Sequence, residues 1–156
     1  MQYKIVEKEA FQAVGTKREF SFENGENLAG IPKMWEEVLG DGTNDRLVSL
    51  NDGVIPGVLG VCIARDNEKM DYWVATSFNG DHPDGFESLE IPKSKWAVFE
   101  VHGAMPVAMQ KAWKKILSEW FPSSGYEHAG TPDLEVYPAE DAYQEDYVSE
   151  IWIPVK

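Results

Sequence analysis

The sequence has few of the residues on which many functional classes depend. Cys62 is the only cysteine among 156 residues, which excludes an intrachain disulfide and a cysteine-based zinc site. It lies in the apolar run GVLGVCIA, so we interpret it as a core residue and not as a reactive thiol. Lysine and arginine number 14 against 27 acidic residues, and the net charge is −13. This balance argues against direct nucleic-acid binding through a basic face.

Long apolar runs and short catalytic motifs are also missing. No stretch approaches the roughly 20 apolar residues that cross a bilayer, and the N-terminal segment mixes charged with apolar side chains, unlike a signal peptide. We therefore expect a cytoplasmic protein without membrane contact. The chain has no phosphate-binding glycine loop, HExxH, GxSxG or paired-cysteine motif, and its three histidines are widely separated. We expect neither a metal nor a cofactor.

The residues that are present indicate one folded domain over residues 1–156. Hydrophobic residues make up 43% of the chain and aromatic residues 12%, a composition typical of a globule and not of a disordered protein. A chain of this length buries roughly two thirds of the surface that its unfolded form exposes. It therefore needs no metal or disulfide to fold.

Two segments have the periodicity of helices with one buried face. In IPKMWEEVLG, residues 31–40, the apolar positions follow the i, i+3, i+4, i+7 pattern, and Gly40 is a suitable end. In MPVAMQKAWKKILSEWFP, residues 105–122, lysines and a glutamate lie opposite the apolar stripe. Pro32 and Pro106 each suit a first helical turn. They are 74 positions apart, close to half the chain.

Strand-like segments surround both helices in the same order. AFQAVGTKREFSF precedes the first helix, and VLGVCIA and KMDYWVATSF follow it; KWAVFEVHG precedes the second, and DLEVY and YVSEIWIPV follow it. This repeat predicts an α+β fold, in which a duplicated β-α-β-β unit forms a mostly antiparallel sheet of about eight strands with two long helices. The pseudo-repeats span about residues 1–80 and 86–156, with a turn-rich seam at Asn79–Gly85.

The last predicted strand contains the most unusual candidate for function. Side chains alternate along YVSEIWIPV, so Glu150 and Trp152 share one face. Apolar residues on both faces indicate a strand that is covered on each side. A carboxylate in that setting must be protonated, be paired or face a cavity. One interpretation is a solvated or lysine-paired surface residue, and the other is a carboxylate at the floor of a pocket.

Aromatic side chains could supply the walls of such a pocket. The candidates are spread over both halves of the chain: Trp35, Trp113, Tyr72, Tyr137 and Trp152. Each of them, taken singly, is also a normal core residue. A pocket with these rings and one buried carboxylate would favour lipophilic, cationic aromatic compounds, because ring faces attract cations and stack on flat apolar groups.

The ordered segments of the chain resemble the GyrI-like small-molecule-binding family, the effector-binding domain of AraC-type and multidrug-sensing regulators. The resemblance covers nearly the whole chain and includes FQAVGTKREFSFENG, IPKMWEEV, GVLGVC and DYVSEIWIPVK. It implies a ligand groove between two repeats, with Glu150 as the acidic residue and Tyr137 and Trp152 in the aromatic wall. Regulators in that family carry a helix-turn-helix domain. Here we expect the stand-alone form, which would act without touching DNA.

Three functions follow from these observations. The leading hypothesis is a stand-alone binding protein that senses or sequesters a lipophilic cation, read out by a protein partner such as a regulator. The second, also implied by the resemblance, is a hydrolase that opens strained cyclopropane rings, with Glu150 as general acid/base and Tyr137 or Tyr72 as its hydroxyl partner. The third is an acidic inhibitor of a DNA-binding enzyme such as gyrase, which the net charge suggests. The natural ligand and the oligomeric state stay open.

Overall fold

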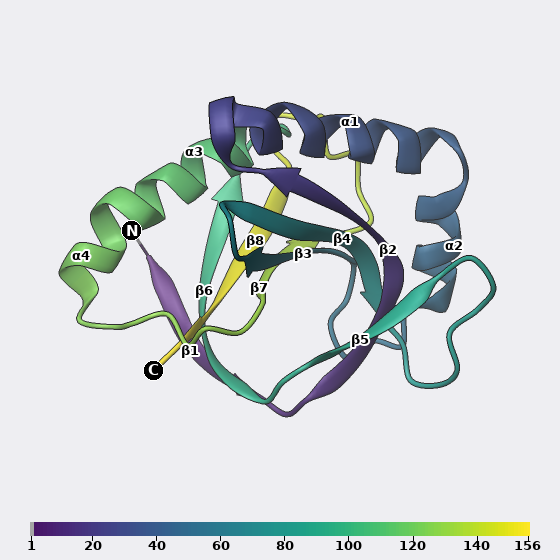
Figure 1. Cartoon of the computed structure of the whole chain (residues 1–156), viewed down its shortest axis with the longest axis horizontal. Coiled ribbons are helices and arrows are strands. Elements are labelled where there is room, and N and C mark those ends of the chain that lie inside the picture. The colour runs from purple at the N-terminus through teal and green to yellow at the C-terminus, as the bar shows by residue number, and fades with distance from the viewer. Residues whose placement is uncertain (1) are drawn as a thin grey trace.

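The fold is a single antiparallel sheet with helices on one face, which confirms the predicted α+β class. The computed structural model describes residues 2–156. Within that range the sheet has eight strands: β1 (Tyr3–Lys8), β2 (Phe11–Ser21), β3 (Val58–Arg65), β4 (Lys69–Ser77), β5 (Glu87–Ile91), β6 (Ser94–His102), β7 (Asp133–Tyr137) and β8 (Val148–Val155). Figure 1 shows the sheet curving strongly, with its helices along the upper and outer side.

The order of the strands is symmetric about the middle of the sheet. It runs β1-β6-β8-β7-β3-β4-β2-β5, so the strands that follow the helices of the two halves, β3 and β7, are the central pair. The first strand of each half crosses to the other half, because β1 pairs with β6 and β5 pairs with β2. Each half has the order β-β-α-β-β, because β1 and β5, which were not among the predicted strand segments, precede the predicted β-α-β-β unit. The residue bounds of the pseudo-repeats stay a prediction.

The helices differ from the sequence prediction at their ends. Helix α1 (Glu26–Gly40) begins before the predicted segment, so Pro32 lies inside it and not in its first turn. Helix α2 (Thr43–Leu50) was not predicted, because it is short and mostly polar. The second predicted helix is α3 (Val107–Lys115), which continues through a π-helical turn, η2 (Ile116–Trp120), into α4 (Phe121–Ser124). A short 3-10 turn, η1 (Glu23–Gly25), precedes α1.

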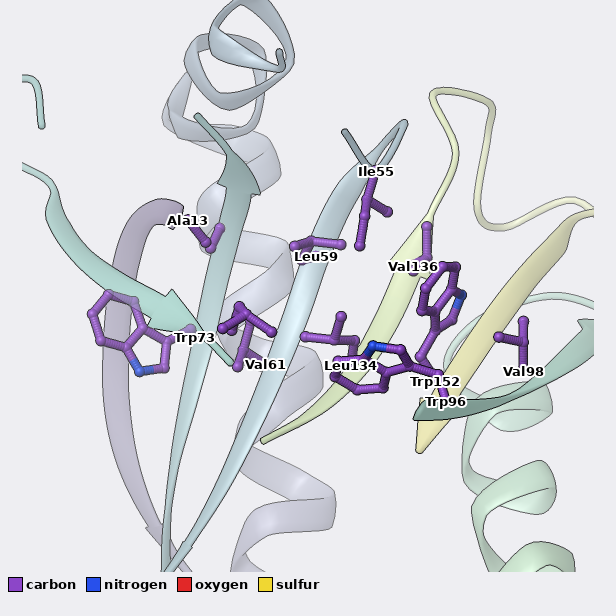
Figure 2. Close-up of a cluster of buried hydrophobic side chains, with 12 residues drawn as sticks. Ala13, Ile55, Leu59, Val61, Trp73, Trp96, Val98, Leu134, Val136 and Trp152 are labelled. Atoms are coloured by element: carbon purple, nitrogen blue, oxygen red, sulfur yellow. The ribbon is translucent and has the colours of Figure 1, made fainter. Parts of the chain in front are cut away.

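The two faces of the sheet have separate hydrophobic cores. On the helical face, one cluster packs under α1 and α2 and another under α3, η2 and α4. The opposite face has its own cluster, which includes Trp73, Trp96 and Trp152 (Figure 2). Leu134 and Val136 of β7 belong to that opposite cluster. Their neighbours in β7 alternate with them and so face the helices.

None of the helices in residues 2–156 has the combination of length and apolar composition needed to cross a bilayer.

Candidate functional site

A large cavity lies on the helical face, between the two halves of the molecule. Its volume is about 1070 Å³, and α1, α3, β3, β7 and the segment 138–147 all contribute to its lining. Its lining includes Leu28 and Leu39 of α1 and Leu117 of η2, which are 55%, 44% and 59% exposed. Exposed leucines in the lining of a cavity are typical of a site that takes an apolar guest.

A proline inside α1 leaves one backbone carbonyl of that helix without its usual donor, and a side chain of α3 supplies the hydrogen bond. Pro32 has no N–H, so the carbonyl of Leu28 lacks the hydrogen bond that the fourth residue along a helix normally donates. The side-chain amide of Gln110, on α3, donates to this carbonyl at 3.1 Å. Because Leu28 and Gln110 both line the cavity, this contact joins its two helical walls.

Glu135, at the centre of β7, is the buried acid of this site. Its side chain lines the cavity, and the residue is only 5% exposed. The hydroxyl of Tyr72 donates to Oε1 at 2.6 Å and that of Tyr137 donates to Oε1 at 2.9 Å. The indole N–H of Trp113 donates to Oε2 at 2.7 Å. The carboxylate therefore accepts three hydrogen bonds from neutral donors, and no salt bridge among residues 2–156 includes it.

The network continues into the first helix. The indole N–H of Trp35 donates to the hydroxyl oxygen of Tyr72 at 2.8 Å. Trp35 and Tyr137 also pack against each other, with ring centroids 4.7 Å apart. Side chains from α1, α3, β4 and β7 thus hold one carboxylate in a fixed position, so that a ligand would meet a charge that is already oriented.

Burial sets the ionisation of this network. Desolvation raises the pKa of Glu135 above its usual range, and the hydrogen bonds from Tyr72, Trp113 and Tyr137 oppose that shift. Burial, with the charge of Glu135, raises the pKa of the Tyr72 and Tyr137 hydroxyls well above the usual value. Both hydroxyls therefore remain protonated donors. Burial also raises the pKa of the Cys62 thiol, which disfavours its reactive thiolate form. Cys62 packs against the core under α1 and α2, but it is half-buried and also lines the cavity.

Gly60 of β3 makes room for this arrangement. A Cβ at that position would lie 2.2 Å from the hydroxyl of Tyr72 and 2.6 Å from Oε1 of Glu135. In the sheet, Gly60 is directly opposite Glu135. Any side chain here would displace the Tyr72–Glu135 hydrogen bond, so the glycine is required by space.

Three of the predicted wall residues line the cavity, and a fourth lies directly behind it. Trp35, Trp113 and Tyr137 are part of the lining. Tyr72 is fully buried and reaches the site only through its hydroxyl. The aromatic residues chosen from the two halves therefore converge, apart from Trp152.

Glu150 and Trp152 lie on the other face of the sheet, which is a correction to the predicted pocket floor. In β8 they share a face, as expected, but Trp152 belongs to the core opposite the helices and lines no part of the cavity. Glu150 is half-buried and accepts a hydrogen bond from the indole N–H of Trp152 at 3.1 Å. The physical reason is strand register: Glu150 is paired with Val136, so both face away from the helices.

The sequence did carry a signal for Glu135. In DLEVY the acid stands between Leu134 and Val136, and Tyr137 shares its face. The argument that singled out Glu150, an acid in the middle of an apolar strand, applies equally here. The sequence of a strand does not show which of its two faces packs against the helices. That argument could therefore not choose between the two glutamates.

The structure offers no metal centre in residues 2–156, where no three histidine, cysteine, aspartate or glutamate side chains gather in a way that could hold an ion. The cavity itself presents the oriented carboxylate of Glu135, other charged side chains, aromatic rings and apolar surface.

The family of integron-associated effector-binding proteins, Cass2, matches residues 4–155 of this chain. No curated protein matches it.

Solved structures match over the full length. The structure of SAV2435 bound to tetraphenylphosphonium is 28% identical, covering 100% of this chain and 94% of that one, with a TM-score of 0.89. A protein of Staphylococcus aureus MU50 described under bacterial transcription regulation is 26% identical over 100% and 99% of the chains, with a TM-score of 0.87. Integron cassette protein VCH_CASS2, from the mobile metagenome of Vibrio cholerae, is 18% identical over 99% and 95%, with a TM-score of 0.71, and shows the fold alone.

Proposed function

The chain belongs to the family of integron-associated effector-binding proteins, and from that premise we propose that its cavity binds a lipophilic cation, with Glu135 as the counter-charge. Sensing or sequestration of such a compound is the function that the geometry supports best. The observation that carries the proposal is the buried carboxylate of Glu135, which lines a cavity of about 1070 Å³. Its hydrogen-bond partners in the described part of the chain are all neutral.

The charge of the cavity wall favours a cation over an anion. Five acidic side chains line the cavity, Glu36, Asp45, Asp133, Glu135 and Glu140, against Lys111 and Lys114. A buried carboxylate without a cationic partner is costly, because no water or ion compensates its charge. A cation that enters the cavity compensates this charge. Binding therefore removes an unfavourable interaction that is present in the unliganded protein, and this gain adds to the affinity.

The rings of the cavity add a preference for aromatic and delocalised cations. Trp35, Trp113 and Tyr137 present aromatic surface beside Glu135. Each ring that a cation meets contributes roughly 0.5–2 kcal/mol. The similarity to SAV2435, whose structure contains tetraphenylphosphonium, supports a guest of this kind, a bulky cation covered by phenyl rings.

Calorimetry with tetraphenylphosphonium tests the proposal. We expect Glu135→Gln to weaken binding by roughly tenfold or more, since the charge is lost from a site shielded from water. Glu150→Gln is the matched control, because it makes the same change on the opposite face and should leave the affinity within about twofold. Tetraphenylborate, with the same shape and the opposite charge, should bind far more weakly. Equal affinity of the wild type and Glu135→Gln would reject Glu135 as the counter-ion.

Hydrolysis of a strained ring is the second candidate, and the contact between Tyr137 and Glu135 at 2.9 Å favours it. In this version Glu135 takes the acid/base role that the sequence assigned to Glu150, with Tyr137 as its hydroxyl partner. Incubation with an activated cyclopropane, followed by mass spectrometry for the addition of water, tests it. Turnover no faster than that of Glu135→Gln would count against an enzyme.

A further inference from the structure

Asp133 is a second acid in the wall of the same cavity. It precedes Glu135 by two residues in β7, so the two side chains share the face under the helices, with their Cα atoms roughly 6.5 Å apart. The side chain of Asp133 is 20% exposed, and its burial raises the pKa of the carboxyl. A ligand at Glu135 that extends along the strand would therefore meet a second, partly desolvated carboxylate.

The two carboxylates differ in their free hydrogen-bonding capacity. A carboxylate offers about four acceptor sites. On Glu135, donors already occupy three of these sites. Within residues 2–156, the one side chain that donates to Asp133 is His128, whose Nε2 lies 2.6 Å from Oδ1. Oδ2 of Asp133 receives no donor from those residues, so it can accept hydrogen bonds from a guest.

His128 itself is held in one orientation. Its Nδ1 accepts a hydrogen bond from the backbone N–H of Gly130 at 2.9 Å. The proton of the neutral ring therefore lies on Nε2, which donates to Asp133. This contact fixes the orientation of Asp133 at the cavity wall.

We propose that Asp133 is a second cation subsite that accepts hydrogen bonds, and that the preferred ligands carry a protonated amine in addition to the ring-bearing cation at Glu135. The inference rests on the proposed function. Glu135 suits a cation without N–H groups, because its acceptor sites are nearly filled. A protonated amine needs acceptors, and Asp133 has them.

The surroundings of Asp133 leave room for a protonated amine, and neither lysine of the cavity lining neutralises its carboxylate. Lys111 and Lys114 also line the cavity. Among residues 2–156, however, Asp133 is paired with His128, whose neutral ring donates through Nε2, and neither lysine forms a salt bridge with Asp133. The cavity volume of about 1070 Å³ slightly exceeds the usual range for sites that take drug-sized ligands, roughly 300–1,000 Å³. A ring-bearing cation with an alkylamine tail is within that size.

Two matched probes test the subsite: triphenylphosphonium with an alkyl tail that ends in a primary amine, and the same compound with a terminal methyl group. In the wild type we expect the amine to bind roughly tenfold more tightly or better. Asp133→Asn should bring this ratio close to one while changing the affinity for the methyl probe by less than about twofold. Asp133→Glu should retain the preference. Glu135→Gln should weaken both probes and leave the amine preferred.

The outcomes separate this inference from the proposed function. If the methyl probe binds but the amine gives no advantage, or if Asp133→Asn leaves the ratio unchanged, Asp133 is not a subsite and the function of Glu135 still stands. If neither probe binds the wild type, both proposals fail. If Asp133→Asn does not fold, the affinity of the wild type is measured instead for a series of amine probes with different tail lengths. A fixed Asp133 predicts one optimal length, and affinity that changes steadily with length would contradict it.

Discussion

The hydroxyl of Tyr72, on β4 of the first half, donates a 2.6 Å hydrogen bond to Oε1 of Glu135, on β7 of the second half. Each residue lies on its own side of the central strand β3, and the glycine between them, Gly60, lets the two side chains meet. The site is therefore built across the junction of the two halves, and changes at this junction should affect stability and ligand binding together.

Removal of the Tyr72 hydroxyl should destabilise the protein and alter the acid. In Tyr72→Phe, Glu135 loses a hydrogen bond that lowers its pKa, and the indole N–H of Trp35 loses its acceptor. We expect the free energy of unfolding to fall by about 1–3 kcal/mol and the pKa of Glu135 to rise further. Urea denaturation and the pH dependence of ligand affinity measure the two effects. An unchanged midpoint would show that the hydrogen bond contributes little.

Substitution of Gly60 should strongly destabilise the protein, because the side chains of Tyr72 and Glu135 occupy the space next to its Cα. Gly60→Ala places a methyl group 2.2 Å from the Tyr72 hydroxyl, and we expect a loss of about 1–3 kcal/mol of stability together with loss of ligand binding. Gly40→Ala is the control. A Cβ at Gly40, the last residue of α1, meets nothing within 4 Å, so this variant should be neutral or slightly stabilised. Similar thermal midpoints for the two variants would contradict the spatial argument.

The affinity for a permanent cation should rise with pH. Burial raises the folded-state pKa of Glu135 above its unfolded value, so its contribution to stability in the unliganded protein is present at low pH. That contribution is lost as pH rises through the folded pKa. A bound cation favours the ionised form. Titrations with tetraphenylphosphonium, which has no titrating group, should therefore give increasing affinity above the ordinary pKa of a glutamate and then a plateau.

Glu135→Gln should remove most of this pH dependence. We attribute any smaller change of affinity with pH that remains in this variant to Asp133, because burial also raises the pKa of that carboxyl. If the profile of Glu135→Gln matched that of the wild type, the proton would have to come from another group.

Two tryptophans on opposite faces should respond differently to the same change. Trp35→Leu removes a ring from the cavity and a hydrogen bond to Tyr72, and we expect roughly 3- to 30-fold weaker cation binding. Trp152→Leu removes a ring from the core opposite the helices, so it should lower stability without a specific effect on affinity. Calorimetry at a temperature where both variants are folded makes the comparison. Equal losses of affinity would argue against the assignment of faces.

The periodic segments were predictable because their signals are local. Helical spacing located most of α1 and the α3–α4 segment, and period-two patterns located strands such as β7 and β8. The short, polar α2 has no comparable apolar stripe, and its Leu47 is its one buried residue. Pro32 was expected in a first turn because a proline removes a hydrogen-bond donor. The missing bond at Leu28 is instead replaced by Gln110, from a helix far along the chain.

Local patterns in the chain were enough to predict the α+β class, six of the eight strands and most of the rings around the cavity, and its ordered segments resemble the effector-binding family. Periodicity and composition are local properties, but they do not fix which glutamate faces the cavity. Glu135 and Glu150 stand in similar apolar strands, but the pairing of Glu150 with Val136 puts it on the face away from the helices. Register between strands and the side on which helices pack arise from contacts between distant segments, and those contacts turned Glu135 and Asp133 towards the same space.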